Sequence, residues 1–253
     1  MFYVGINDIL CLFICGLLTG ILALKGAVFC SYPNLIFISG VAGGVFWCNE
    51  TISSILLALN RCLEISIPSF SDYLFFGYKT WIWLFIPFLY SLIDLIFKPV
   101  LFNGIYFSWF FNPNIGYIDD FGKIYYNHMI TFNNIVVVTI LPGSYILFII
   151  ILICKKSSIK FTNKSQKKIF IQVFFISSIN IIAAIIYVYM QFIHINKYII
   201  FIGMFGWFFT HGFKSIIYLL LNETIQNDFL KMIYLVISRF NRIASTTMNL
   251  NVI

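Results

Sequence analysis

Residues 131–154 read TFNNIVVVTILPGSYILFIIILIC, and residues 155–168 read KKSSIKFTNKSQKK. The first stretch has no charged residue, and it exceeds the about 20 apolar residues that a helix needs to cross the hydrocarbon core of a bilayer. Backbone amides inside lipid have no water to bond, so the stretch is expected to be a helix. The lysines that follow cannot enter the core, and they indicate where the chain returns to water.

Five more stretches share this long apolar character. The sequence thus predicts an all-α, polytopic membrane bundle in a single domain, 1–253, without linker or internal repeats. Only 10% of the residues are charged, whereas about a quarter are charged in soluble domains. In tail residues 223–243, apolar side chains recur every three or four positions, and basic side chains occupy positions between them. This pattern indicates an amphipathic helix on the inner leaflet. The other five predicted spans are 2–24, 34–60, 80–101, 169–190 and 198–221.

Lysine and arginine are concentrated in alternate connections. Eleven of the sixteen lie in 61–79, in 155–168 or beyond residue 222. Basic residues of short loops stay in the cytoplasm, so these segments and both termini are expected to face the cytosol. The net charge of +7 therefore reports topology, and we expect no nucleic-acid partner. The opposite side holds Lys25, Lys98, Lys123 and Lys197.

Ionisable residues within the spans are costly, and each is a candidate for function. Asp8 and Lys214 are predicted to lie at similar depths from the inner face, so we hypothesise an ion pair between them. The alternative is that Lys214 snorkels to the inner headgroups while Asp8 binds water and asparagine side chains. His211, Tyr218 and Asn222 on the last span are grouped with this pair and with Glu50 as an intramembrane polar network.

Glu50 lies in the middle of the second span, where ligand contact, proton relay and a neutral hydrogen-bonded acid are all open, the last being favoured by burial. Asp94 and Lys98 are one turn apart and are expected to form a local helix pair. Arg61 ends the second span, where it either anchors to headgroups or engages a signalling partner. The apolar periodicity of the span does not decide between these two roles of Arg61.

Catalytic and metal-binding motifs are not found in the sequence. It contains no H-E-x-x-H, no G-x-S-x-G and no glycine-rich phosphate loop, so neither enzyme activity nor a cofactor is expected. The six cysteines form no CxxC pair, and a zinc site is not favoured. Cys30 is the one cysteine predicted on the outer side, and it is expected to be a free or buried thiol.

Several short motifs occur in one order along nearly the whole chain. They are Gly26 to Pro33 (GAVFCSYP), Leu59 to Ile65 (LNRCLEI), Lys98 to Phe102 (KPVLF), Ser108 to Phe111 (SWFF), and Trp207, His211-Gly212, Ile217-Tyr218 and Asn222. With these motifs the chain resembles the nematode chemosensory serpentine receptors of class T, a family of seven-helix G-protein-coupled receptors.

The resemblance implies that the six spans correspond to helices two to seven, with the first helix absent. Asn60, Arg61 and Cys62 occupy the place of the acidic-Arg-Tyr activation signature of rhodopsin-like receptors. Asp8 looks like the second-helix aspartate that commonly binds sodium or water in such receptors. Lys214 stands where a proline is expected, which puts normal signalling in doubt.

By this resemblance, the chain is expected to be a multi-pass receptor in the plasma membrane of sensory neurons. A small molecule would bind among the outer halves of the helices, and the inner loops would engage a heterotrimeric G protein. Glu50, Asn133 and Trp207 lie at plausible depths for ligand contact. Two alternatives stay open: a small transporter or channel in which Asp8, Glu50 and Lys214 line a water-filled path, and a membrane protein that assembles with a partner without signalling.

Overall fold

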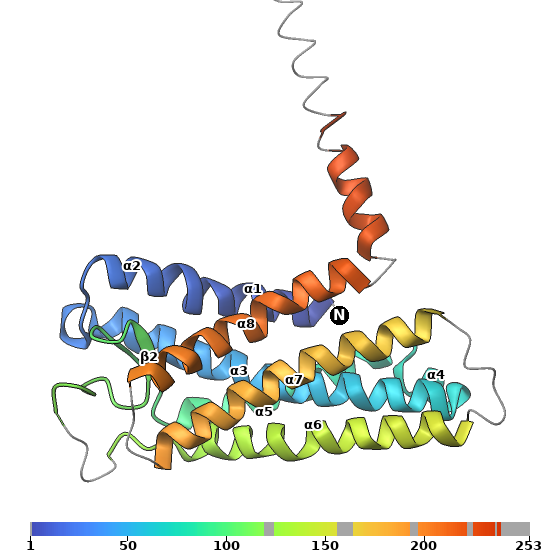
Figure 1. Ribbon diagram of the computed structural model, residues 1–253, viewed down its shortest axis with the longest axis horizontal. Coiled ribbons are helices and arrows are strands. Elements are labelled where there is room, and N and C mark those ends of the chain that lie inside the picture. Colours follow the sequence, from blue (N-terminus) through green and yellow to red (C-terminus); the bar gives the residue numbers. More distant parts are fainter. Residues whose placement is uncertain are drawn as a thin grey trace, which may run out of the picture.

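A computed structural model describes residues 2–118, 124–155, 164–192, 197–221, 225–235 and 237–238. Its helices lie along the long axis of the molecule, with a small β-hairpin at one end and α4 at the other (Figure 1). The bounds, in chain order, are α1 Phe2–Leu12, η1 Phe13–Leu18, α2 Thr19–Leu24, η2 Phe29–Ser31, α3 Pro33–Ser66, α4 Pro68–Phe75, α5 Lys79–Leu92, η3 Ile93–Ile96, β1 Leu101–Asn103, β2 Ser108–Phe110, α6 His128–Lys155, α7 Lys164–Phe192 and α8 Lys197–Leu221.

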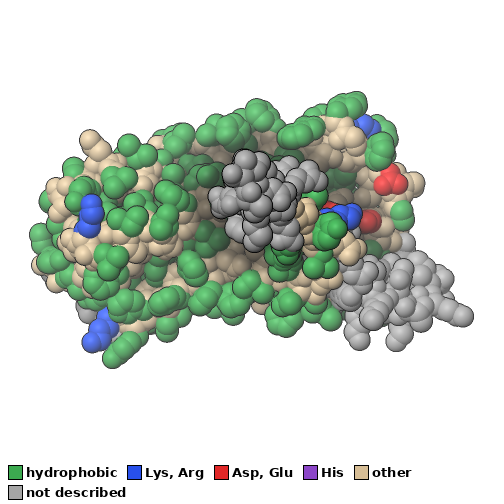
Figure 2. Space-filling model, turned by 90° about the horizontal axis from the view of Figure 1, so that it is seen from above, with side chains coloured by type: hydrophobic (Ala, Val, Ile, Leu, Met, Phe, Trp, Pro, Cys, Tyr) green, Lys and Arg blue, Asp and Glu red, His purple; other side chains and the backbone are tan. Residues whose placement is uncertain are grey.

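Six helical segments of the described chain are long and apolar enough to cross a membrane, which confirms the predicted all-α membrane bundle. They are residues 2–24, 33–66, 79–96, 128–151, 174–192 and 197–221. Figure 2 shows a flank on which hydrophobic side chains extend along the whole length and charged side chains gather toward the two ends. A surface of this kind suits contact with lipid chains between two layers of headgroups.

Helix α3 lies at the centre of the bundle and packs against α1, α5 and α6. The remaining neighbours are α6 with α7, α7 with α8, and α8 with α1. The N-terminal end of α1 and the C-terminal end of α8 both lie toward the end that carries α4 (Figure 1). An even number of spans puts both of these ends on the same side of the bundle, and α1 and α8 also pack against each other.

The first span is one helix with a π-helical segment, η1, in its middle. There Thr19 Oγ1 donates a hydrogen bond to the carbonyl oxygen of Ile14 at 2.9 Å. The same hydroxyl accepts a hydrogen bond from Trp109 Nε1 of the hairpin at 2.8 Å. The irregular turn therefore anchors the first span to the hairpin, as π-segments often serve a specific contact.

The third span ends earlier than predicted. Its helix stops at Ile96 rather than continuing to residue 101, and Phe97 is extended (φ −101°, ψ 165°). Pro99 explains the difference, because the residues just before a proline disfavour helical conformation. The freed chain forms the hairpin, in which Phe102 pairs with Trp109.

Asp94 and Lys98 do not form the local pair expected from the sequence. The break before Pro99 removes the helical register that would bring them together. Lys98 Nζ instead donates to the carbonyl oxygen of Ile124, and Asp94 is buried against α3. That expectation was wrong because it assumed an unbroken helix.

The expected surface helix at 223–243 is partly described. Residues 225–235 are helical, and in Figure 1 this segment runs across the long axis of the bundle at the end where α8 stops. Residues 222–224, 236 and 239–253 lie outside the described part. Contact of this helix with the membrane surface stays a prediction.

Candidate functional site

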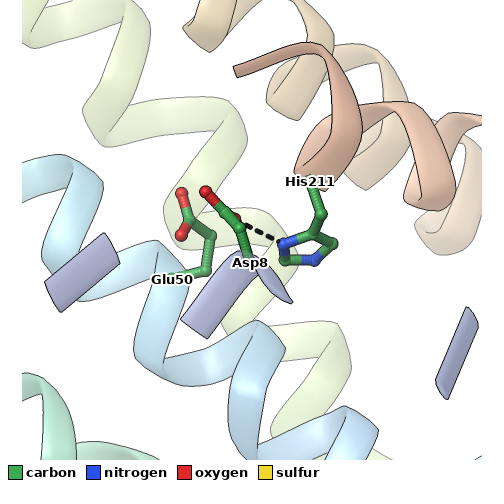
Figure 3. A group of neighbouring side chains, drawn as sticks. All are labelled: Asp8, Glu50 and His211. Carbon is green, nitrogen blue, oxygen red and sulfur yellow. Dashed lines mark hydrogen bonds and ion pairs between the residues drawn. The ribbon is translucent and has the colours of Figure 1, made fainter. Parts of the chain in front are cut away.

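Four ionisable side chains meet in the interior of the bundle, and we call them the charge cluster. Asp8 comes from α1, Glu50 from α3, and His211 and Lys214 from α8; Figure 3 shows the first three converging. Lys214 Nζ lies 3.1 Å from Asp8 Oδ1, with each side chain only 2% exposed. The hypothesised ion pair is therefore present, and the snorkelling alternative for Lys214 is wrong.

His211 shares the carboxylate that Lys214 binds. Its Nδ1 lies 2.7 Å from Asp8 Oδ1, a distance at which a protonated Nδ1 donates to the carboxylate. His211 and Lys214 are three residues apart on α8, so they present side chains on the same helix face. The acidic partner of His211 is not visible in the sequence around it, because Asp8 is 203 residues away along the chain.

Glu50 completes the cluster from the central helix. Its Oε1 forms an ion pair with Lys214 Nζ and accepts a hydrogen bond from Ser54 Oγ at 2.7 Å. The Glu50 carboxylate therefore has an ammonium partner as well as a hydroxyl partner. One lysine thus ties α1, α3 and α8 together through two carboxylates.

The cluster also has the ligand types of a metal site. One ligand atom from each of Asp8, Glu50 and His211 lies within 4.8 Å of the others, and carboxylates with imidazole bind several divalent metals. Here the ammonium of Lys214 contacts both carboxylates, so the chain itself supplies the cation. We therefore treat the cluster as an ion-pair network.

The last two members of the predicted polar network fall outside what the structure describes. For Tyr218 this applies to the side chain, and for Asn222 to the whole residue. Their participation stays a prediction.

Polar side chains beside the cluster strengthen the contact between α1 and α3. Asn7 Nδ2 donates to the carbonyl oxygen of Phe46 at 3.1 Å, and Asn49 Nδ2 donates to the hydroxyl of Tyr3 at 2.7 Å. Asn7 directly precedes Asp8 in the sequence, and Asn49 directly precedes Glu50. The first and second spans are thereby joined by hydrogen bonds as well as by charge.

An apolar pocket lies between the charge cluster and the hairpin end, and we call it the outer pocket. It holds about 380 Å³ of empty volume, part of which is open to the surroundings, between α3, α6, α7, α8 and the extended chain after η3. Among the residues that the structure describes, no charged side chain lines this pocket. The lining residues are Gly43, Gly44, Trp47, Val100, Ile130, Asn134, Ala183, Tyr187 and Trp207.

Two of the three residues considered for ligand contact lie elsewhere. Trp207 lines the outer pocket, whereas Glu50 belongs to the charge cluster. Asn133 donates to Thr51 Oγ1 at 2.8 Å and accepts from the Tyr90 hydroxyl at 3.1 Å. Its neighbour Asn134 faces the pocket, a difference of one helical position that apolar patterning does not resolve.

Trp47 connects the outer pocket with the charge cluster. Its ring forms part of the pocket wall, and its Nε1 donates to Asn134 Oδ1 at 2.7 Å. The same ring packs edge-on against the His211 ring, with centroids 6.2 Å apart. A molecule in the pocket would therefore press on a side chain that contacts the cluster directly.

At the opposite end of α3 lies what we call the inner mouth, formed by Asn60, Arg61 and Cys62. Arg61 pairs with Glu64 at 2.7 Å and is 20% exposed. Asn60 Oδ1 accepts a hydrogen bond from Ser71 Oγ of α4 at 3.2 Å, and Cys62 Sγ contacts the Ser144 carbonyl oxygen of α6 at 3.7 Å. The three residues thus join α3 to α4 and α6, at a place where their predicted role in activation stays open.

The fold and the site together define a class of protein: a polytopic helical bundle with a pocket toward one end, a basic mouth at the other and buried charges between them. The family model of the serpentine type seven-transmembrane G-protein-coupled chemoreceptors, Srt, matches residues 1–242. The chain belongs to this family, as the resemblance predicted.

The chain is similar to serpentine receptor class T-55 of Caenorhabditis elegans. The two chains are 28% identical over 236 residues, which is 92% of this chain and 64% of the relative. The chain therefore spans slightly less than two thirds of the relative's length. This share limits what the relative's name implies for the activity of this chain.

Proposed function

We propose that the chain is a chemoreceptor that binds a small molecule in the outer pocket and signals through the inner mouth to a heterotrimeric G protein. The observation that carries the proposal is the contact between Trp47 of the pocket and His211 of the charge cluster. Ligand binding shifts a two-state bundle only if it contacts the two states differently. Movement of Trp47 provides such a difference.

In this proposal the charge cluster is the element with two arrangements. Lys214 bridges carboxylates from α1 and α3 while extending from α8, so a shift of α8 changes both ion pairs together. Interfaces of this kind switch between discrete packings rather than deforming continuously. The ligand would thereby alter how α8 and α3 meet at the inner end.

The proposed partner surface is the inner mouth with the lysine-rich connection at 155–168. Arg61 is held by Glu64 within α3, and an exposed pair of this type is weak enough to exchange for another partner. We place this side in the cytosol, beneath the plasma membrane, and the concentration of its basic residues supports that orientation. Expression in sensory neurons belongs to the same proposal.

A reconstitution experiment tests the proposal. The full chain in lipid nanodiscs is mixed with a heterotrimeric G protein and a panel of volatile odorants, and nucleotide exchange on the α-subunit is followed. We expect one or more odorants to accelerate exchange, and Arg61→Ala to abolish the acceleration while leaving odorant binding intact.

Lys79→Ala is the matched control, because Lys79 is another basic residue at the inner end of a span and donates to the Tyr73 carbonyl oxygen. It should leave exchange unchanged. Odorant binding without any exchange, or equal exchange with and without Arg61, would contradict the receptor proposal. Odorant-dependent ion flux lost with Glu50→Gln would support the transport alternative instead.

A further inference from the structure

Asp94 is a buried carboxylic acid that the charge cluster does not use. It is 2% exposed, and neither of its carboxylate oxygens has a hydrogen-bond partner of good geometry among the described residues. The Asn127 side chain lies close to it, but that amide already donates to the Lys98 carbonyl oxygen at 2.6 Å. Asn127 therefore offers at most one further N–H and no charge.

Removing an unpaired carboxylate from water is costly, so Asp94 needs either a proton or a cation. No lysine, arginine or histidine within the described part of the chain forms an ion pair with it. The nearest basic residue in sequence, Lys98, binds the Ile124 carbonyl oxygen instead. If the compensating charge is a cation, none of the described basic residues supplies it in an ion pair.

The Asp94 carboxylate packs against Gly44, behind the wall of the outer pocket. A Cβ atom on Gly44 would overlap the carboxylate, and Gly44 is itself part of the pocket wall. A Cβ atom on the adjacent Gly43 would lie 3.1 Å from the Trp207 ring. The two glycines thus leave α3 without side chains between the carboxylate on one side and the aromatic wall on the other.

The wall of the outer pocket is suited to a cation with apolar substituents. Three aromatic side chains line it, Trp47, Tyr187 and Trp207. Aromatic faces attract cations, tryptophan most strongly, and aromatic cages of this kind bind quaternary ammonium groups. The lining contains no positively charged side chain that would repel such a group.

We propose that the ligand of the outer pocket is a small organic ammonium ion, with Asp94 as its counter-ion and the three aromatic rings around its apolar substituents. The inference rests on the proposed function, because it assigns a ligand class to the same pocket. Its basis is independent, since a carboxylate without an ion pair to any described residue packs on Gly44, a residue of the pocket that the three aromatic rings line.

Two probes of equal shape test the charge requirement. Choline and 3,3-dimethylbutan-1-ol differ by the replacement of the quaternary nitrogen with carbon. Each is titrated into the full chain in nanodiscs, and tryptophan fluorescence reports binding because Trp47 and Trp207 line the pocket. We expect choline to bind at least tenfold more tightly than the alcohol, and Asp94→Asn to remove that difference.

Asp72→Asn on α4 is the control, since it removes an acidic charge at the other end of the bundle, and it should leave the tenfold preference intact. Tyr187→Leu gives a second, independent variant: it should weaken choline binding at least threefold and leave the alcohol unchanged. Equal affinities in the unaltered chain, or a preference that survives Asp94→Asn, would overturn the inference and indicate that Asp94 is neutralised by a proton.

The two proposals fail separately. If neutral odorants drive nucleotide exchange through Arg61 and Asp94→Asn has no effect, the receptor proposal stands and the ammonium inference falls. If choline binds with the expected dependence on Asp94 but no ammonium compound changes exchange, the ligand class stands and the receptor proposal falls.

Discussion

Substitution of Lys214 by methionine should destabilise the bundle strongly. The substitution keeps a long, unbranched side chain, shorter by one atom, but leaves Asp8 and Glu50 without their ammonium partner. At the observed 3.1 Å from Asp8 Oδ1, an effective dielectric constant of 20 gives about 5 kcal/mol for one charge pair. Removal of one partner from a buried pair costs about 3–5 kcal/mol in free energy of unfolding.

Unfolding can be followed with a thiol-reactive fluorophore, because Cys11, Cys15 and Cys48 are free and buried. For a chain of this size each kcal/mol shifts the melting temperature by roughly 2–4 °C, so the loss of about 3–5 kcal/mol in Lys214→Met should lower it by roughly 6–20 °C. The triple substitution Lys214→Met, Asp8→Asn, Glu50→Gln removes the unpaired charges together and should recover most of the loss. A stable single variant, or a triple variant no better than the single one, would refute the assignment of Lys214 as the shared cation.

Two further predictions use the same thermal assay. Gly40→Ala should lower the free energy of unfolding by about 1–3 kcal/mol, because its Cβ atom would overlap the backbone carbonyl oxygen of Val100. The control Gly20→Ala has no atom within 4 Å of its Cβ position and should be neutral or stabilising. Equal losses in the two variants would contradict the close approach of Gly40 to Val100. Trp109→Phe should cost about 1–3 kcal/mol, because it removes the buried hydrogen bond to Thr19; an unchanged melting temperature would show that the hairpin is not anchored there.

Apolar length and charge were sufficient to predict the six spans. The hydrophobic requirement of a bilayer acts on each segment separately, so it is visible in local sequence. The cost of unpaired charge in lipid likewise made the pairing of Asp8 with Lys214 predictable before their helices were placed together.

Features that depend on the rotation of a helix about its axis, or on a local break in a helix, were not predictable. The choice between Asn133 and Asn134 at the pocket depends on how α6 is turned about its axis. The pair expected between Asp94 and Lys98 assumes an unbroken helix, and Pro99 ends that helix after Ile96. The contact of Glu50 with Lys214 is not visible in the sequence, because the sequence does not show that one lysine reaches both Glu50 and Asp8.

We expect the outer pocket to open toward the outside of the cell and Arg61 to face the cytosol. Two native thiols report this directly, since Cys30 and Cys154 are both exposed and lie at opposite ends of the spans. On intact cells, a membrane-impermeant maleimide should label Cys30, and Cys154 should react only after permeabilisation. Labelling of Cys154 on intact cells, with Cys30 protected, would contradict the orientation and with it the direction of signalling.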